Sequence, residues 1–173
     1  MAMFNYLTRV ADASGVEFDY ASPLPAFEPE RDREPAPRPD RASWPVIADE
    51  FRTLPGFPAT NEAWQRWHEY VFDSGEPLKR RDRGLLARAA AQETCDRARA
   101  DELAEHTPRD DREERLDGFA RKLSRSPWRM DASDLRALRD LGYPEPALLH
   151  AISVVALQNA ESRLAMGRAL TAR

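Results

Sequence analysis

The chain has 173 residues, 42% of them apolar and 32% charged, with a formal net charge of −4 at neutral pH. This length allows one domain with a sizeable core, and the mild acidity argues against nucleic acid or an anionic membrane as a partner, because both are bound by basic surfaces. A single cysteine excludes an internal disulfide framework and a cysteine-based zinc site.

The beginning of the chain shows no sign of a targeting segment. Residues 1–9 lack a basic stretch followed by a long apolar run, so a signal peptide is not expected. Apolar side chains recur at helical spacing over residues 3–10 and favour a short amphipathic helix. The longest apolar-looking stretch, residues 147–157, is too short to cross a bilayer. We therefore expect a cytoplasmic protein that does not bind membranes.

A Pro-rich segment follows. Nine of the 14 prolines fall in the first 58 residues, and over residues 27–39 they alternate with charged side chains. A helix cannot form there, because each proline removes a backbone donor and restricts the residue before it. The segment is either a solvated linker or an extended arm that wraps a neighbouring subunit, with Phe27 and Trp44 as anchors. We divide the chain into this N-terminal arm (residues 1–44) and a helical domain (residues 45–173).

Helical signals begin at residue 45. Pro45 opens a short helix that Pro55 ends. A second helix, capped by Thr60 or Asn61 and ended by Gly75, carries a core-facing stripe spaced i, i+3, i+7 and i+8: Trp64, Trp67, Val71 and Phe72.

Residues 79–106 predict a third helix, rich in alanine and in other strong helix formers. Residues 112–124 predict a fourth, a fifth follows a cap at Asp131 or Ser133, and the last covers residues 146–166. No alternation typical of strands occurs. The predicted fold is all-α, with five to seven helices in one domain that follows the extended Pro-rich arm.

Cys95 is the only thiol and lies within the third predicted helix. On an ideal helix it shares one stripe with residues three or four positions apart, namely Arg88, Gln92, Arg99, Glu102 and His106. Arg99 beside it would lower the pKa of the thiol and favour a reactive thiolate. Cys95, Arg99 and Glu102 are therefore the candidate catalytic residues. The alternative is a small, half-buried cysteine beside a surface ladder of charges.

The histidines are more typical of structural positions than of a catalytic or metal site. Glu102 and His106 are four residues apart and could share a metal, but two ligands are more typical of a surface pair. His68 is expected at an interface or a helix end, and His150 as a hydrogen-bonded core residue. No metal or cofactor is predicted.

The second half of the chain carries a family resemblance. Residues 118–127 (GFARKLSRSP) and 130–142 (MDASDLRALRDLG) resemble the run "FA-K-T--P--M---D---LR--G" of the alkylhydroperoxidase D and carboxymuconolactone decarboxylase superfamily, in its peroxidase-related branch. Residues 154–159, with Arg163 and Gly167 after them, are similar to its final helix. Residues 78–87 resemble its "L--RERELIAL" entry to the catalytic helix, so that the resemblance covers roughly residues 61–170.

The resemblance implies an all-α protein that forms trimers or hexamers. Redox members of the family reduce peroxides with a Glu, a Cys-x-x-Cys pair and a His on or near one long helix. A thiolate of low pKa attacks the peroxide, the second thiol resolves the sulfenic acid as a disulfide, and the Glu and His move protons.

This chain departs from the family at each of these positions. The family Glu aligns with Gly84, the first Cys with Cys95 or Asp96, the second Cys with Ala98 or Arg99, and the His with Glu102 or Leu103. No register restores the cysteine pair. Peroxide reduction with intramolecular resolution is therefore excluded.

Three hypotheses follow. The first is a degenerate, non-peroxidase member that works by assembly, as a homo-oligomer or as the structural partner of an intact paralogue. The second is an enzyme that reuses the family pocket for acid-base chemistry on a small acidic molecule, with Arg88, Arg99 and Glu102. The third is a one-cysteine thiol peroxidase that uses Cys95 and an external thiol.

Overall fold

The computed structural model describes residues 34–45, 47 and 58–171. This part of the chain contains six α-helices and no strand, which confirms the predicted all-α fold. The helices are α2 (Pro58–His68), α3 (Arg80–Glu93), α4 (Arg97–Glu102), α5 (Asp111–Arg125), α6 (Ala132–Asp140) and α7 (Glu145–Thr171). Two 3-10 turns, η1 (Arg41–Ser43) and η4 (Pro127–Arg129), and a π-helical turn, η3 (Glu69–Asp73), complete the elements. The predicted helices over residues 3–10 and 45–55 and the Phe27 anchor lie outside the described residues, apart from Pro45 and Ile47.

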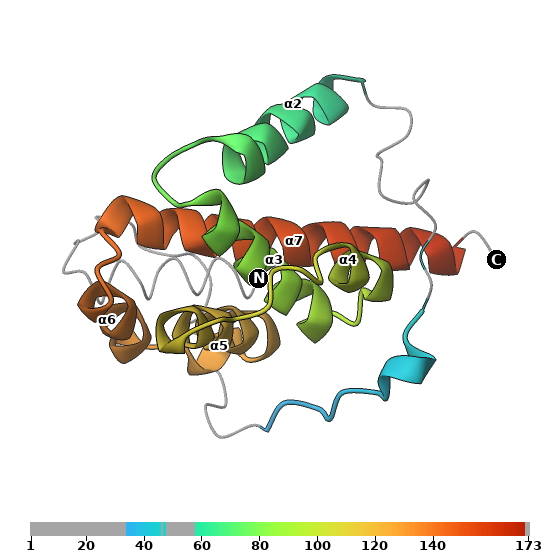
Figure 1. The fold of residues 1–173 in the computed structure, drawn as a ribbon. Coiled ribbons are helices and arrows are strands. Elements are labelled where there is room, and N and C mark those ends of the chain that lie inside the picture. Colours follow the sequence, from blue (N-terminus) through green and yellow to red (C-terminus); the bar gives the residue numbers. More distant parts are fainter. Residues whose placement is uncertain (1–33, 46, 48–57, 172–173) are drawn as a thin grey trace, which may run out of the picture.

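The core lies where α3 packs against α5 and α7. In Figure 1, α7 runs across the molecule, with α2 above it and α5 and α6 below. The alanines of α3 let the two neighbouring helices approach closely, because the distance between packed helices depends on the side chains at the contact. The fully buried core side chains of the three helices are Leu85, Leu86, Ala87, Ala89, Ala90, Ala91, Leu116, Ala120, Val154 and Ala165.

A buried carboxylate ties three elements together. Asp82 on α3 is 3% exposed, accepts a 3.2 Å hydrogen bond from the hydroxyl of Tyr143 and pairs with Arg112 of α5 at 3.2 Å. The Arg112 guanidinium also lies 4.3 Å from the centre of the Tyr143 ring. Burial raises the pKa of Tyr143 strongly, and the Asp82 carboxylate adds to this effect, so the phenol stays a donor.

Removing the Tyr143 hydroxyl tests how much its hydrogen bond to Asp82 contributes to stability. We expect Tyr143→Phe to lower the free energy of unfolding by about 1–2 kcal/mol, because Asp82 loses a buried donor. Tyr70→Phe is the matched control, since Tyr70 is 53% exposed, and it should change the stability by less than about 0.5 kcal/mol. Urea unfolding measures both variants. If Tyr143→Phe were as stable as the wild type, the Tyr143–Asp82 hydrogen bond would make no net contribution to stability.

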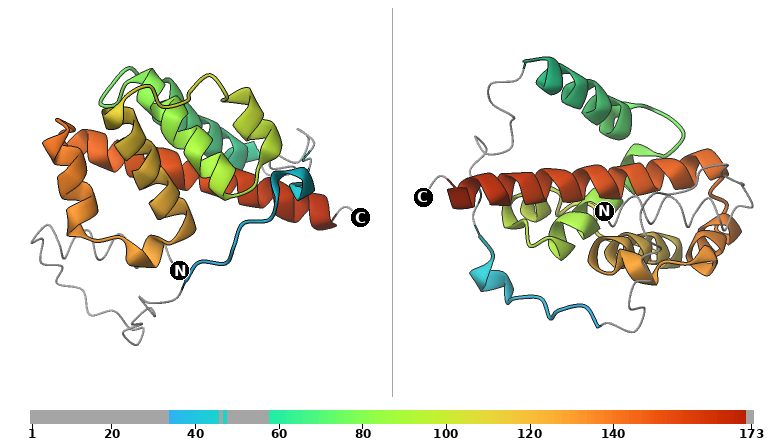
Figure 2. Two further views of the ribbon diagram at one scale, coloured as in Figure 1. Left: turned by 60° about the horizontal axis from the view of Figure 1, so that its bottom comes forward. Right: turned by 180° about the vertical axis from the view of Figure 1, so that it is seen from behind.

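The described end of the Pro-rich segment lies against its own chain, along the outside of the helices (Figure 2). Glu34 pairs with Arg129 at 2.7 Å, the carbonyl of Ala36 accepts from Arg125, and Arg38 pairs with Glu93 at 3.0 Å. Trp44 is 8% exposed, so it anchors the segment within the same chain. Residues 34–45 are called the arm below.

The predicted continuous helix over residues 79–106 is wrong. α3 ends at Glu93, Cys95 adopts a left-handed backbone conformation (φ 60°), and α4 begins after Asp96. The Asp96 carboxylate caps α4 by accepting from the backbone N–H of Arg99 at 3.3 Å. The predicted stripe from Arg88 to His106 is therefore split between two helices.

The predicted core-facing stripe of the second helix is correct only in part. Val71 is fully buried, and Trp64 and Phe72 pack partly buried against the core. Trp67, however, is 46% exposed. The physical reason is the π-helical turn η3, whose wider turn changes the phase between Trp67 and the residues that follow it.

Candidate functional site

Cys95 lies half-buried in the turn between α3 and α4. Burial raises the pKa of its thiol, the Arg38 guanidinium of the arm lowers it, and Glu93 raises it further. The net shift is upward, which is opposite to the direction expected from Arg99. At neutral pH the structure therefore favours a neutral thiol, which is a poor nucleophile.

The other two candidate catalytic residues lie together. Arg99 pairs with Glu102 at 2.8 Å, and its Nε donates to Gln158 Oε1 of α7 at 3.2 Å. Gln158 then donates to Ser162, whose hydroxyl donates to the buried Asp96 carboxylate at 2.8 Å. This polar chain holds α4 against α7. Among the described residues, the thiol of Cys95 makes no hydrogen bond to this chain. The structure therefore brings Arg99 and Glu102 together in a set of contacts that serves the fold.

His106 has a different neighbour from the one expected. It follows α4, and its Nε2 lies 3.4 Å from Glu105, not from Glu102. Its ring packs on Gly84 so closely that a Cβ there would lie 2.4 Å from the imidazole. Gly84 is the position that the resemblance aligns with the family Glu, so the imidazole occupies the space that a longer side chain would need. Among the described residues, no group of three or more His, Cys, Asp or Glu side chains could hold a metal ion.

Next to Cys95, arginines converge from the arm, α3 and α5. We call six residues the arginine cluster: Arg38, Arg88, Glu93, Asp117, Arg121 and Arg125. Glu93, with its side chain 2% exposed, lies at the centre, 3.0 Å from both Arg38 and Arg121 and 3.9 Å from Arg125. Asp117 contacts Arg121 directly and lies 3.7 Å from Arg88.

Sequence reasoning missed the arginine cluster. The spacing of Asp117, Arg121 and Arg125 places them on one face of α5, and this was the available local signal. The pairing of Arg38 with Glu93 spans 55 positions and could not be read from spacing. In the structure, the charged side chains near Cys95 therefore gather at the junction of the arm, α3 and α5, and not along the predicted stripe.

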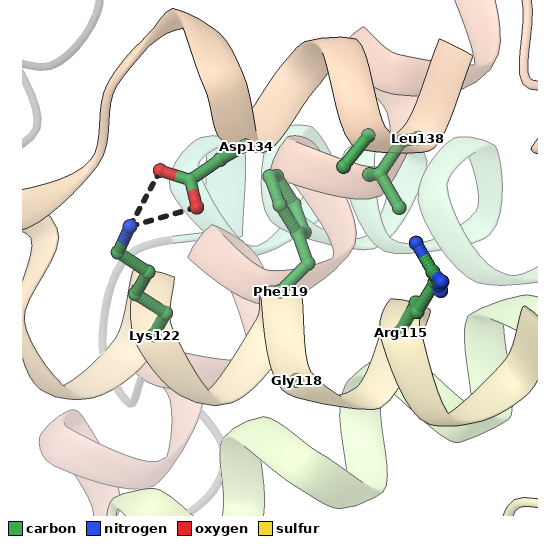
Figure 3. A pocket seen from close by; sticks show the side chains of 7 residues that line it. Arg115, Gly118, Phe119, Lys122, Asp134 and Leu138 are labelled. Atoms are coloured by element: carbon green, nitrogen blue, oxygen red, sulfur yellow. Dashed lines mark hydrogen bonds and ion pairs between the residues drawn. The ribbon is translucent and has the colours of Figure 1, made fainter. Parts of the chain in front are cut away.

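A pocket of about 250 Å³ lies between α5 and α6. Figure 3 shows Phe119 at its centre, Arg115 at one end and the Lys122–Asp134 pair at the other, with nitrogen–oxygen distances of 2.7 and 2.8 Å. Leu138 and Gly118 also line it. Because Asp134 neutralises Lys122 and caps α6 through the N–H of Asp131, this end of the pocket serves the fold.

Two buried side chains, Arg83 and His150, hold η3 in place. Arg83, 1% exposed, donates to the carbonyls of Phe72 and Ser74, and its Nε and Nη2 have no partner among the residues that the structure describes. His150, 2% exposed, contacts the carbonyl of Val71 through Nε2 at 2.8 Å, as expected for a hydrogen-bonded core histidine. Burial lowers the pKa of His150, the Val71 bond raises it, and Arg83 lowers it further.

The comparisons with known proteins add no identification. No family model matches the chain, and a search of curated proteins finds no match. No described helix has both the length and the apolar character needed to span a bilayer.

Proposed function

We propose that this chain is a subunit of a homo-oligomer, related to the alkylhydroperoxidase D and carboxymuconolactone decarboxylase superfamily, that works by assembly and does not reduce peroxides. The observation that carries the proposal is the outward side of α7. We call it the α7 face, and its residues are spaced three or four apart: Leu149, Ser153, Ala156, Ala160, Leu164, Gly167 and Leu170. Leu149 is 55% exposed, Leu164 43% and Leu170 71%.

The α7 face is too apolar for a helix surface that meets only water. Residues 146–160 contain no charged side chain, although surface helices normally carry charges on their outer side. Two exposed aromatic residues extend the apolar surface. Trp67 is 46% exposed and lies 5.7 Å from the ring of Tyr70, which lies 5.3 Å from His150 on α7. Exposed apolar side chains that lie together on one helix side are typical of a surface that binds another protein.

The occupant that suits this surface best is a second copy of the same chain. Ala156 and Ala160 lie in the middle of the face, where small side chains permit two helices to approach closely. In an antiparallel pair centred near Ala156, Leu149 of each copy lies beside Leu164 of the other. The face is therefore complementary to itself in both size and polarity, as a two-fold interface requires.

The chemistry of the single thiol supports the second part of the proposal, namely that the chain does not reduce peroxides. No second cysteine exists to resolve a sulfenic acid, and the pKa of Cys95 is raised by burial. Arg99 is held by Glu102 and Gln158, and the imidazole of His106 fills the place above Gly84. We expect no catalytic consumption of hydrogen peroxide in the presence of dithiothreitol.

Sedimentation velocity tests the assembly. We expect the wild-type chain to sediment as a homo-oligomer at micromolar concentration. Ala156→Glu should sediment as a folded monomer, because it places a charge in the middle of the α7 face. Ala98→Glu, at an exposed position of α4, is the matched control and should remain oligomeric. A wild-type chain that is monomeric at 100 μM would overturn the proposal, as would an oligomer that Ala156→Glu leaves intact.

A further inference from the structure

We propose that the arginine cluster is a binding site for a phosphate dianion, either free inorganic phosphate or the phosphate group of a phosphomonoester. The first argument is charge. The six residues bring four guanidinium groups together with two carboxylates, so the cluster carries two more positive than negative charges, although each arginine contacts one of the two carboxylates. Partly buried charges of one sign favour a counter-ion of matching charge, and a dianion neutralises this excess.

The second argument is that the positive charge of Arg88 is poorly neutralised. Its side chain is only 15% exposed, and the ion pair that it makes with Asp117, its one such pair among the described residues, is long at 3.7 Å. Asp117 is engaged more closely by Arg121. Burial lowers the pKa of Arg88, Asp117 raises it, and both Arg121 and Arg41 of the arm lower it. Arg88 is thus a desolvated cation that faces two other cations.

The third argument is a set of donors with no acceptor. The Nε of Arg125 is buried and makes no hydrogen bond within the described part of the chain, while its Nη2 donates to the carbonyl of Ala36. The hydroxyl of Ser124, which precedes Arg125 on α5, is also buried and has no hydrogen-bond partner in residues 34–45, 47 and 58–171. Phosphate offers several acceptor oxygens, and the planar guanidinium of arginine binds such oxygens in pairs.

Other cations of the described chain are less suitable. Arg99 is held by Glu102 and Gln158, Lys122 is neutralised by Asp134, and Arg83 bonds to two backbone carbonyls. The arginine cluster also receives Arg38 from the arm. A ligand there would hold the arm against α3 and α5, and this inference does not depend on self-association through the α7 face.

Calorimetric titration of the full chain tests the site. Inorganic phosphate is added at constant ionic strength, with sodium chloride as the balancing salt. We expect saturable binding of one phosphate per chain and a higher melting temperature than in chloride alone. Arg88→Gln should weaken binding at least tenfold, as should Arg38→Gln, which removes a half-exposed residue of the arm and should not affect folding. Arg136→Gln, at an exposed position of α6, should bind as the wild type does.

Phenyl phosphate and acetate distinguish the ligand class. Phosphate and phenyl phosphate of equal affinity would assign the site to the phosphate group alone. Phenyl phosphate that binds at least tenfold more tightly would assign it to a phosphomonoester. Acetate that competes as well as phosphate would overturn the assignment of a dianion. The site itself is wrong if phosphate gives no more heat or stabilisation than chloride, or if Arg88→Gln and Arg38→Gln both bind as the wild type does.

Discussion

Glu93→Gln is expected to lower the free energy of unfolding by about 3 kcal/mol. The substitution keeps the size of the side chain and removes the carboxylate that pairs with Arg38, Arg121 and Arg125. Breaking a buried ion pair costs about 3–5 kcal/mol, because the remaining charge stays desolvated without a partner. We expect the lower end of this range, since the three guanidinium groups remain about one third exposed.

Urea unfolding at low salt measures the effect. Glu102→Gln is the matched control, because Glu102 is 64% exposed in its pair with Arg99, and its loss should cost less than about 1 kcal/mol. Raising the salt concentration should return part of the stability of Glu93→Gln, since counter-ions then shield the three arginines. If the free energy of unfolding of Glu93→Gln lay within about 0.5 kcal/mol of the wild-type value, Glu93 would not organise these side chains.

The second large effect is a loss of stability on mild acidification. The folded chain holds the pKa of His150 below its ordinary value of 6.5, mainly through burial and also through Arg83. The pKa of His106 is lowered too, first by burial and then by Arg81, Arg80 and Arg109. Below pH 6.5 the unfolded chain therefore binds protons that the folded chain does not, and stability falls as the pH falls.

The slope of this loss identifies its source. Each histidine contributes up to about 1.4 kcal/mol per pH unit below 6.5, until its folded-state pKa is reached. His150→Gln removes one titrating group that faces Arg83 and the Tyr70 ring, so its stability should change less between pH 7 and 5.5 than that of the wild type. The double variant with His106→Gln should be nearly independent of pH over this interval. Parallel profiles for the wild type and His150→Gln would contradict the assignment.

Local signals predicted the fold well where the determining contacts are local. The cap at Asp131 could be read from its spacing to Asp134, and the two side chains form the reciprocal pair of hydrogen bonds that this spacing favours. The apolar spacing of α5 placed Leu116 and Phe119 on the buried side. These features depend on residues no more than four positions apart.

Contacts between distant segments account for what could not be predicted. The helix break at Cys95 looked continuous because Thr94, Cys95 and Asp96 are only moderately poor helix formers, and the bond from Ser162 that holds Asp96 comes from 66 positions away. The same limit hid the pairing of Arg38 with Glu93. Of the candidate site, Arg99 and Glu102 were correctly placed as neighbours, whereas the cation near Cys95 belongs to the arm.

The position of α7 in the chain also bears on how the protein is made. Every other described helix precedes α7, yet α3 packs against it and η3 is held by its His150. On the ribosome, the 27 residues of α7 take about one to five seconds to synthesise at about 5–20 residues per second. During that interval α3 can already pack against α5, whereas the side of α3 that contacts α7 is still open to chaperones. The core contacts between α3 and α7 therefore form only after α7 has emerged.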